Sequence, residues 1–437
     1  MTPPRIQELV RGLDWKKAIL FLLLAATLTG VVARVYRRAQ AIAPLSPQSR
    51  FMLDRSVSLS ATMDPDIFPG AVWPPGYPLV LLSARHAGFP VGMVNLVLFL
   101  GALALVFLVS RTAFPDVSPW WATLLFGLCG FNYYNLPQYT SEALVIPLIL
   151  LILVSLERLF LRSNFRAFAL LSLACSLLFI TRYHAFLWLA PVVFGNLFFL
   201  AFKLRKMPVW QALVSIALAI LPLCAVLFLN YQNTGYPTGM GRFDWSARES
   251  SAYIETFENA TTLSANLARV GTIYWLDFGS PFVHATHAVL LSKYRFTNFE
   301  IVSALLFFLA VGALLVALID RVRHKRPPTL AALASHRSSL MGLLILEFLG
   351  MYLFITLLFW TIGNNDPLYT RYLYPSHVYL ILGMFAGYSF IRRRFDSLYA
   401  RIPFQVLYGY ILAVNLYKII DTIFLQNKLV YSILPPG

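Results

Sequence analysis

Carboxylates that could transfer a proton are concentrated in one polar stretch near the start of the chain. Asp54, Asp64 and Asp66 are the only acidic residues between positions 33 and 90. A carboxylate within reach of a hydroxyl group can act as a general base, which typically contributes about 10²–10⁴-fold to a reaction rate. Each also has a plainer interpretation, Asp54 as a solvated surface acid and Asp64-Pro65-Asp66 as a turn. The sequence leaves both interpretations open.

Arginines that could bind a phosphate form a second group of candidates. A guanidinium group makes two parallel hydrogen bonds to a phosphate, and lysine cannot reproduce that geometry. An arginine at the end of an apolar run can instead lay its stem on apolar surface and extend its charge to the headgroups. In order of preference, the candidates are Arg371, Arg182, Arg55 and Arg242.

One further acid, Glu142, opens an apolar run within Ser141-Glu142-Ala143-Leu144. It is either a catalytic carboxylate or a charge that complements the dipole at a helix N-terminus. A metal site is not expected, because His284 and His287 have no acid or cysteine at matching spacing. We therefore predict no metal and no cofactor.

The most distinctive stretch is Trp73-Pro74-Pro75-Gly76-Tyr77-Pro78, which an apolar segment follows. The prolines fix backbone angles, and Gly76 permits a tight turn. Trp73 and Tyr77 have the amphipathic rings that collect at the level of membrane headgroups. The stretch predicts a loop that leads into a short helix over about 77–87, too short to span a membrane and suited to lie at its surface. Trp73 and Tyr77 are candidates for binding a substrate.

The elements that must position these residues are membrane helices. The chain is 59% hydrophobic and 12% charged, against about 25% charged in an average soluble domain. A mean hydropathy of +0.69 over 437 residues requires apolar segments along most of the length. The net charge of +16 is interpreted as cytoplasmic basic loops rather than as a nucleic-acid surface.

The pattern predicts one all-α membrane domain over residues 1–437, with about eleven membrane-spanning helices. A first outer loop over 33–90 carries helices that lie at the membrane surface, and a large outer loop covers 230–298. The predicted spans are Ala18–Val32, Val91–Ser110, Trp120–Leu136, Ala143–Leu156, Ala167–Ile180, Ala185–Phe202, Val209–Leu229, Ile301–Ile319, Leu340–Thr361, Tyr374–Ile391 and Phe404–Phe424.

Basic residues set the expected orientation. A cytoplasmic N-terminus places more than half of the 35 basic residues in short cytoplasmic loops, as the positive-inside rule requires. Most of the polar chemistry then falls on the extracytoplasmic face. We expect an integral protein of the cell inner or plasma membrane whose active face is extracytoplasmic.

Four stretches together resemble a known family. These are the Trp-Pro-Pro-Gly-Tyr-Pro tract, Ser141-Glu142-Ala143-Leu144, Asn-Tyr-Gln-Asn-Thr-Gly-Tyr-Pro at 230–237, and Arg371-Tyr372-Leu373-Tyr374-Pro375. Their order along the chain and their predicted position on the extracytoplasmic side are similar to those in the GT-C superfamily of membrane glycosyltransferases. The closest likeness is to the branch of protein mannosyltransferases and lipid A aminoarabinose transferases.

The resemblance implies transfer of a sugar from a polyprenyl-phosphate carrier to an acceptor hydroxyl, without a metal. The acceptor is a lipid, a glycan or a protein, and membrane lipid is a further partner. Arg371 and Tyr372 lie in the best-matching motif for phosphate binding. The chain departs from the family at the base, because no acid occupies positions 46–48. Asp54 could serve after a shift in register.

Two other functions are weighed against this one. A lipid or solute transporter would favour paired halves and several intramembrane charges. The chain has an odd number of predicted spans and one acid well inside a span, Glu347, which could pair with a loop arginine. A non-catalytic membrane subunit with the same fold would explain the missing acid at 46–48.

Overall fold

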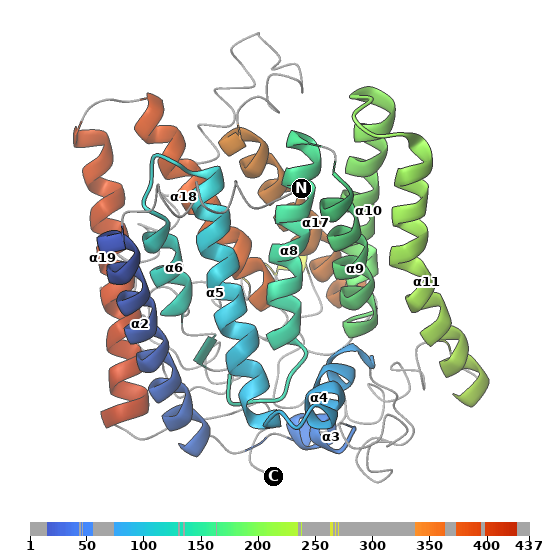
Figure 1. Ribbon diagram of the computed structural model, residues 1–437, viewed down its shortest axis with the longest axis horizontal. Coiled ribbons are helices and arrows are strands. Elements are labelled where there is room, and N and C mark those ends of the chain that lie inside the picture. The colour runs from blue at the N-terminus through green and yellow to red at the C-terminus, as the bar shows by residue number, and fades with distance from the viewer. Residues whose placement is uncertain are drawn as a thin grey trace.

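Helices make up the regular structure in the part of the chain that the structure describes (Figure 1). The computed structural model describes residues 15–42, 45, 47–55, 74–129, 132–133, 136–162, 164–234, 237, 263–264, 267, 270, 337–362, 373–394 and 398–425. The helices are α2 (Trp15–Ile42), α3 (Pro47–Arg55), α4 (Gly76–His86), η1 (Val91–Met93), α5 (Val94–Ala113), α6 (Pro119–Gly127), α8 (Glu142–Leu161), α9 (Phe165–Thr181), α10 (Ala185–Phe198), η2 (Phe199–Lys203), α11 (Val209–Thr234), α17 (Arg337–Ile362), α18 (Tyr374–Arg394), α19 (Leu398–Ile419) and η4 (Ile420–Leu425).

Five of the described helices are long and apolar enough to cross a membrane. Two shorter apolar helices, Phe165–Thr181 and Phe404–Tyr417, accompany them. The predicted run 301–319 lies outside the described residues. The five long apolar segments are Val91–Ala113, Glu142–Leu161, Ala185–Lys203, Val209–Gln232 and Leu340–Leu358.

Helix α8 forms the centre of the bundle and α11 its edge. Of the most apolar stretch in each helix, 78% is buried in α8 but only 22% in α11. Helix α8 packs against α5, α9, α17 and α18, while α11 packs mainly on α9 and presents Leu213, Leu221 and Phe228 outward. An outward apolar face of this kind suits contact with lipid chains.

The short helices α3 and α4 lie together at one end of the bundle, which we call the α4 end (Figure 1). Helix α9 finishes at this end, because Gly76 of α4 lies against Thr181, the last residue of α9. Helix α8 begins at the same end, since its first residue, Glu142, pairs with Arg182. The opposite end, where α8 finishes, is called the far end.

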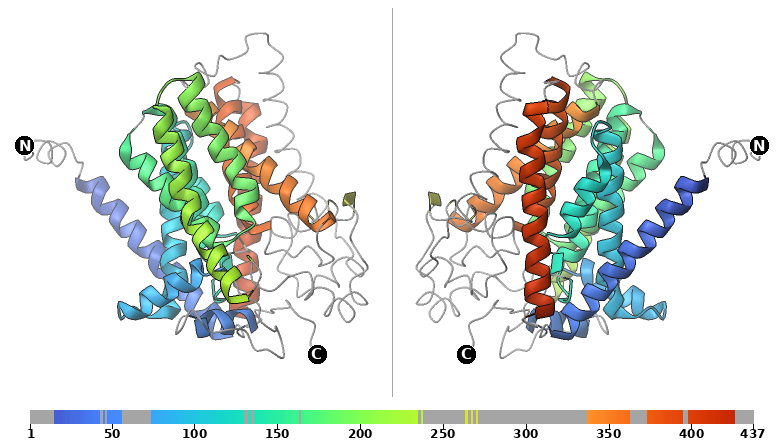
Figure 2. Two further views of the ribbon diagram at one scale, coloured as in Figure 1. Left: turned by 90° about the vertical axis from the view of Figure 1, so that its right-hand side faces the viewer. Right: turned by 90° about the vertical axis from the view of Figure 1, so that its left-hand side faces the viewer.

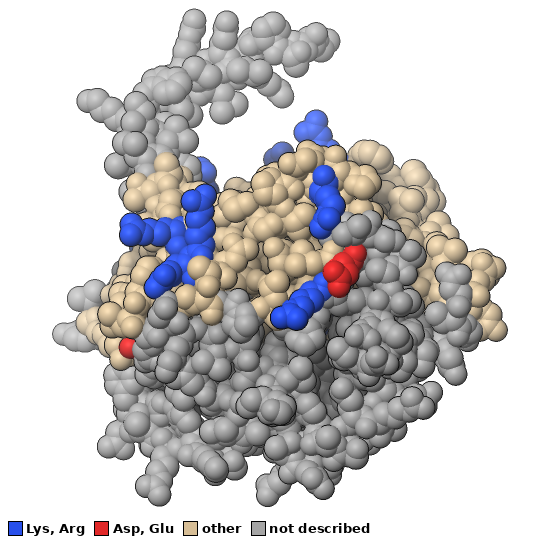
Figure 3. Space-filling view, turned by 90° about the horizontal axis from the view of Figure 1, so that it is seen from below, with Lys and Arg blue, Asp and Glu red and all other residues tan. Residues whose placement is uncertain are grey.

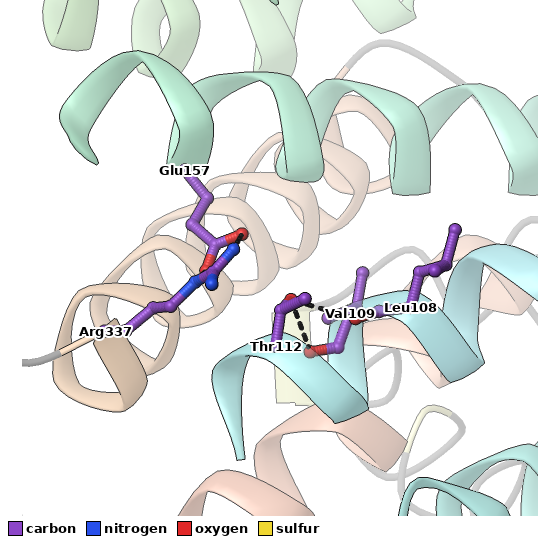
Figure 4. A network of polar contacts seen from close by, with 5 residues as sticks. All are labelled: Leu108, Val109, Thr112, Glu157 and Arg337. Atoms are coloured by element: carbon purple, nitrogen blue, oxygen red, sulfur yellow. Dashed lines mark hydrogen bonds and ion pairs between the residues drawn. The ribbon is translucent and has the colours of Figure 1, made fainter. Parts of the chain in front are cut away.

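An ion pair joins two helices at the far end (Figure 4). Glu157, in the last turns of α8, accepts hydrogen bonds from Nε and Nη2 of Arg337, the first residue of α17. Nearby on α5, the Thr112 hydroxyl donates to the carbonyl groups of Leu108 and Val109 at 2.8 and 3.2 Å. The Glu157–Arg337 pair places the end of α8 and the start of α17 on the same side, as the predicted alternation of spans requires.

Helix α2 is longer than its apolar run. It continues to Ile42, ten residues beyond the predicted end at Val32. In this extension, Val35, Tyr36 and Ala39 are buried, whereas the arginines that alternate with them are exposed. The extension therefore has the two faces of an amphipathic helix. The N-terminal half of α2 leans away from the other helices (Figure 2).

The predicted span Trp120–Leu136 is wrong as a single helix, because α6 ends at Gly127. The Asn132 side-chain amide donates to the Phe126 carbonyl at 2.5 Å. The same carbonyl, which the last turn of the helix leaves without a partner within the helix, also accepts from Cys129 N at 3.2 Å. Two donors beyond the ninth helical residue thus bond to this carbonyl where the chain turns.

Candidate functional site at the α4 end

The Trp-Pro-Pro-Gly-Tyr-Pro tract packs against the end of α9 through Gly76. A Cβ atom at Gly76 would lie 2.3 Å from Thr181 Oγ1 and 2.8 Å from both Thr181 Cα and Thr181 N. The prediction that Gly76 makes a tight turn is wrong, because Gly76 is the first residue of α4. Glycine is needed there because two backbones approach each other too closely for a side chain.

The neighbouring prolines explain why the helix can begin at this point. Pro75 precedes the helix, and its carbonyl accepts from Leu79 N at 2.8 Å. Pro78 lies in the first turn, where a missing N–H costs no helical hydrogen bond. Helix α4 ends at His86, close to the predicted boundary.

A buried ion pair joins α8 to the turn between α9 and α10. Arg182, the residue after Thr181, pairs with Glu142 through Nη2 and donates from Nε to Ser141 Oγ at 3.1 Å. The side chains of Arg182 and Glu142 are 9% and 1% exposed. Glu142 is also the first residue of α8, so it lies at the positive end of the helix dipole. The structure thus brings together two residues that the sequence proposed separately.

Tyr77 anchors a network of hydrogen bonds beside this pair. Its hydroxyl donates to Asn95 Oδ1 at 2.6 Å, and Asn95 Nδ2 donates to the carbonyl groups of Leu136 and Gln138 at 3.0 and 2.7 Å. Burial raises the pKa of Tyr77 well above its ordinary value, and the nearby Tyr139 adds to this effect. A neutral, fully buried hydroxyl at this point holds α4 and α5 to the segment that leads into α8.

Helix α3 is attached to that same segment. Ser49 Oγ donates to Gln138 Oε1 at 2.7 Å and accepts from Tyr139 N at 3.0 Å. Asp54, in the last turn of α3, is exposed, and no ion pair with a described residue engages its carboxylate. Arg50 is exposed one helical turn before it, so the two side chains share one face of α3.

The Asn-Tyr-Gln-Asn-Thr-Gly-Tyr-Pro tract reaches the same site from α11. Asn230 Nδ2 donates to Tyr183 Oη at 3.0 Å and to the Pro237 carbonyl at 3.2 Å. Tyr183 follows Arg182 in the turn between α9 and α10. Three of the four stretches that carry the resemblance therefore meet at the α4 end.

The fourth stretch is described only from its third residue. Leu373 and Tyr374 are buried at the start of α18, and the Leu373 carbonyl accepts from Ser376 Oγ at 2.5 Å. Asp64, Asp66, Trp73, Arg242, Arg371 and Tyr372 lie outside the described residues, as does the side chain of Arg55.

Exposed charge at this end is mainly positive. Viewed from below, basic side chains are spread over the described part of the face and acidic ones are scarce (Figure 3). The exposed basic residues of α2, α3 and α4 in this region are Arg34, Arg37, Arg38, Arg50 and Arg85. Such a surface attracts phosphate groups. Among the described residues, no group of three or more His, Cys, Asp or Glu could hold a metal ion.

The network also includes four residues that were not predicted from the sequence, Ser49, Asn95, Gln138 and Thr181. Only Asn95 gave a usable signal, because an amide within the otherwise apolar run 91–108 requires a hydrogen-bonding partner when buried. No family model, curated protein or solved structure matches this chain.

Proposed function

We propose that the chain is a membrane glycosyltransferase that moves a sugar from a polyprenyl-phosphate carrier to an acceptor hydroxyl at the α4 end. In this proposal the chain has about eleven spans, a cytoplasmic N-terminus and an extracytoplasmic α4 end. The observation that carries it is the meeting of three distant sequence stretches around one buried polar cluster. The stretches that resemble the GT-C superfamily can take part in one reaction only if the fold brings them together.

We assign the general base to Asp54. Its carboxylate is exposed and can accept a proton from an acceptor in water, whereas Glu142 is buried and already engaged by Arg182. The acceptor oxygen attacks the anomeric carbon of the sugar, and the bond from that carbon to the phosphate oxygen breaks. The carrier phosphate leaves with the bonding electrons, and Asp54 takes the acceptor proton.

We assign the first phosphate contact to Arg50, one turn before Asp54 on the exposed face of α3. A guanidinium group at this position can stabilise the negative charge that develops on the leaving phosphate. Arg50 is a further cation for this role, in addition to the predicted candidates Arg371 and Arg242, which lie outside the described residues. The exposed arginines of α2 and α4 would draw the carrier lipid towards it.

In this assignment the Glu142–Arg182 pair positions the site rather than reacting. Its partners fix the start of α8, the end of α9 and, through Gly76 and Thr181, the start of α4. Because α4 packs on the end of α9 and α3 packs on α4, the ion pair holds α3 and α4 at a constant distance from the bundle. Reaction geometry depends on such distances, since a displacement of about 1 Å can cost about 10²-fold in rate.

Transfer activity in proteoliposomes tests the proposal. Purified protein would be supplied with a panel of radiolabelled polyprenyl-phosphate sugars and with membrane lipid and glycan extracts as acceptors. Asp54→Asn should lower transfer by about 10²–10⁴-fold without weakening the binding of the donor. Asp116→Asn is the matched control, because Asp116 lies near the far end, where it accepts from Ser389 Oγ at 3.0 Å.

One result would contradict the assigned base and another the function itself. Full activity in Asp54→Asn would remove Asp54 as the base and transfer that role to Asp64 or Asp66. Failure of the wild-type protein to transfer any sugar in the panel, with the fold intact, would reject the glycosyltransferase itself.

A transporter is the second candidate, and one contact favours it. Glu347, inside the apolar segment of α17, accepts a hydrogen bond from Asn196 Nδ2 of α10 at 2.9 Å. The basic loop before α17, with which Glu347 could pair, lies outside the described residues. Intramembrane acids often mark transport pathways. Solute or lipid flux that Glu347→Gln abolishes, in a protein without transferase activity, would establish this alternative.

A further inference from the structure

A cavity of about 190 Å³ lies between α6, α18 and α19 near the far end, away from the site described above. It is lined by residues from the start of α6, the last turns of α18 and the first turns of α19. The ends of three helices therefore surround the cavity. None of the stretches that carry the proposed function contributes to it.

The walls of the cavity are aromatic. The rings of Trp121 and Tyr408 lie 4.6 Å apart, and those of Tyr388 and Phe404 stack at 4.6 Å. Tyr408 Oη donates to the Trp121 carbonyl at 2.6 Å, and Phe385 meets Tyr408 edge to face at 5.9 Å. These ring contacts and the hydrogen bond join α6, α18 and α19 around the cavity.

The lining also includes polar groups. Arg392, Gln405 and Ser118 contribute to it and are exposed. Gln405 Nε2 donates to Tyr388 Oη at 3.4 Å, and no ion pair with a described carboxylate engages the Arg392 guanidinium. An apolar interior with a cation and hydrogen-bond donors at its exposed edge fits a molecule that is apolar at one end and anionic at the other.

We propose that this cavity binds one anionic phospholipid, with the phosphate on Arg392 and the upper part of an acyl chain against Trp121 and Phe404. Trp and Tyr collect at the level of headgroups, and basic residues at the end of a membrane helix attract anionic lipids. Two other exposed arginines at this end, Arg162 and Arg166, would raise the local concentration of such lipids.

The size of the cavity limits what else could bind. Its volume of about 190 Å³ is below the range of about 300–1,000 Å³ for sites that enclose a drug-sized ligand. It can hold the headgroup region of a lipid whose chains continue into the bilayer, but it cannot enclose a nucleotide sugar. The proposal is independent of the function assigned to the α4 end.

Native mass spectrometry of the purified full chain tests the proposal, with phosphatidylglycerol and phosphatidylcholine as separate probes. We expect wild-type protein to retain one phosphatidylglycerol at about tenfold higher occupancy than phosphatidylcholine, because the choline cation cancels the charge of its phosphate and is repelled by the Arg392 guanidinium. Arg392→Gln should remove this preference. Arg111→Gln, which changes an exposed arginine outside the cavity, should keep it.

A second variant separates the cavity from charge alone. Gln405→Trp fills the cavity with a ring while Arg392 remains, and it should also abolish the retained lipid. Equal retention of both lipids by wild type would overturn the proposal, as would unchanged retention in Arg392→Gln and Gln405→Trp. Competition by glycerol phosphate at the same strength as the lipid would show a headgroup-only site and would also reject the acyl-chain contact.

Discussion

Replacing Gly76 with alanine tests whether the two backbones of α4 and α9 must touch. The new Cβ would lie 2.8 Å from Thr181 N and Cα, whereas ordinary contact begins at 3.4 Å. Helix α4 must therefore retreat by about 0.6 Å from a backbone that cannot rotate away. Overpacking of this kind costs about 1–3 kcal/mol, and we expect a loss of that size in the free energy of unfolding.

The control is Gly101→Ala in α5, where a Cβ would meet nothing within 4 Å. Alanine is favoured over glycine in a helix interior, so this variant should be at least as stable as wild type. Unfolding of both variants would be followed in lipid nanodiscs against a denaturing detergent. Equal stability of Gly76→Ala and wild type would refute the close approach.

A double variant shows which atoms of Thr181 are responsible. Thr181→Ala removes Oγ1, which is 2.3 Å from the added Cβ, but leaves the backbone contacts at 2.8 Å. Gly76→Ala should therefore remain destabilising in the Thr181→Ala background. Full recovery there would show that the side chain, and not the backbone, set the spacing. In the same preparations, transfer activity should fall with Gly76→Ala if α3 and α4 position the reaction.

Three further results are expected at the α4 end. Glu142→Gln and Arg182→Gln should each cost about 3–5 kcal/mol and the double variant less than their sum; additive losses below about 1 kcal/mol would indicate a surface pair. Burial raises the pKa of Tyr77, so the free energy of unfolding should be retained below pH 10.0 and fall above it, where the unfolded tyrosine ionises. Tyr77→Phe should reduce that fall, and an unchanged pH profile in this variant would contradict the reasoning. Ser49→Ala should speed hydrogen exchange in α3 but not in α8, and unchanged exchange in α3 would show that other contacts hold it.

Local composition was enough to predict the helical class and several of the helices. Apolar runs of sufficient length predicted α5, α10, α11 and α17, because membrane-spanning segments need continuous apolar side chains. The run predicted for α8, Ala143–Leu156, is shorter than the helix, which continues to Leu161. The short helix after the proline tract was predicted within one residue at each end. The same patterns failed at the end of α6. This helix stops at Gly127, where Cys129 N and Asn132 Nδ2 both bond to the Phe126 carbonyl, and nothing in the apolar run indicates these contacts.

For the candidate site, the sequence determined which residue types were present, and the tertiary structure decided which of them meet. Glu142 and Arg182 are 40 positions apart, and each had a separate explanation until packing of α8 on α9 paired them. Gly76 was assigned to a turn, because spacing alone does not show that another backbone lies against it. Residue type and local order specify a helix, but contact between distant segments depends on how helices pack, which no short stretch of sequence contains.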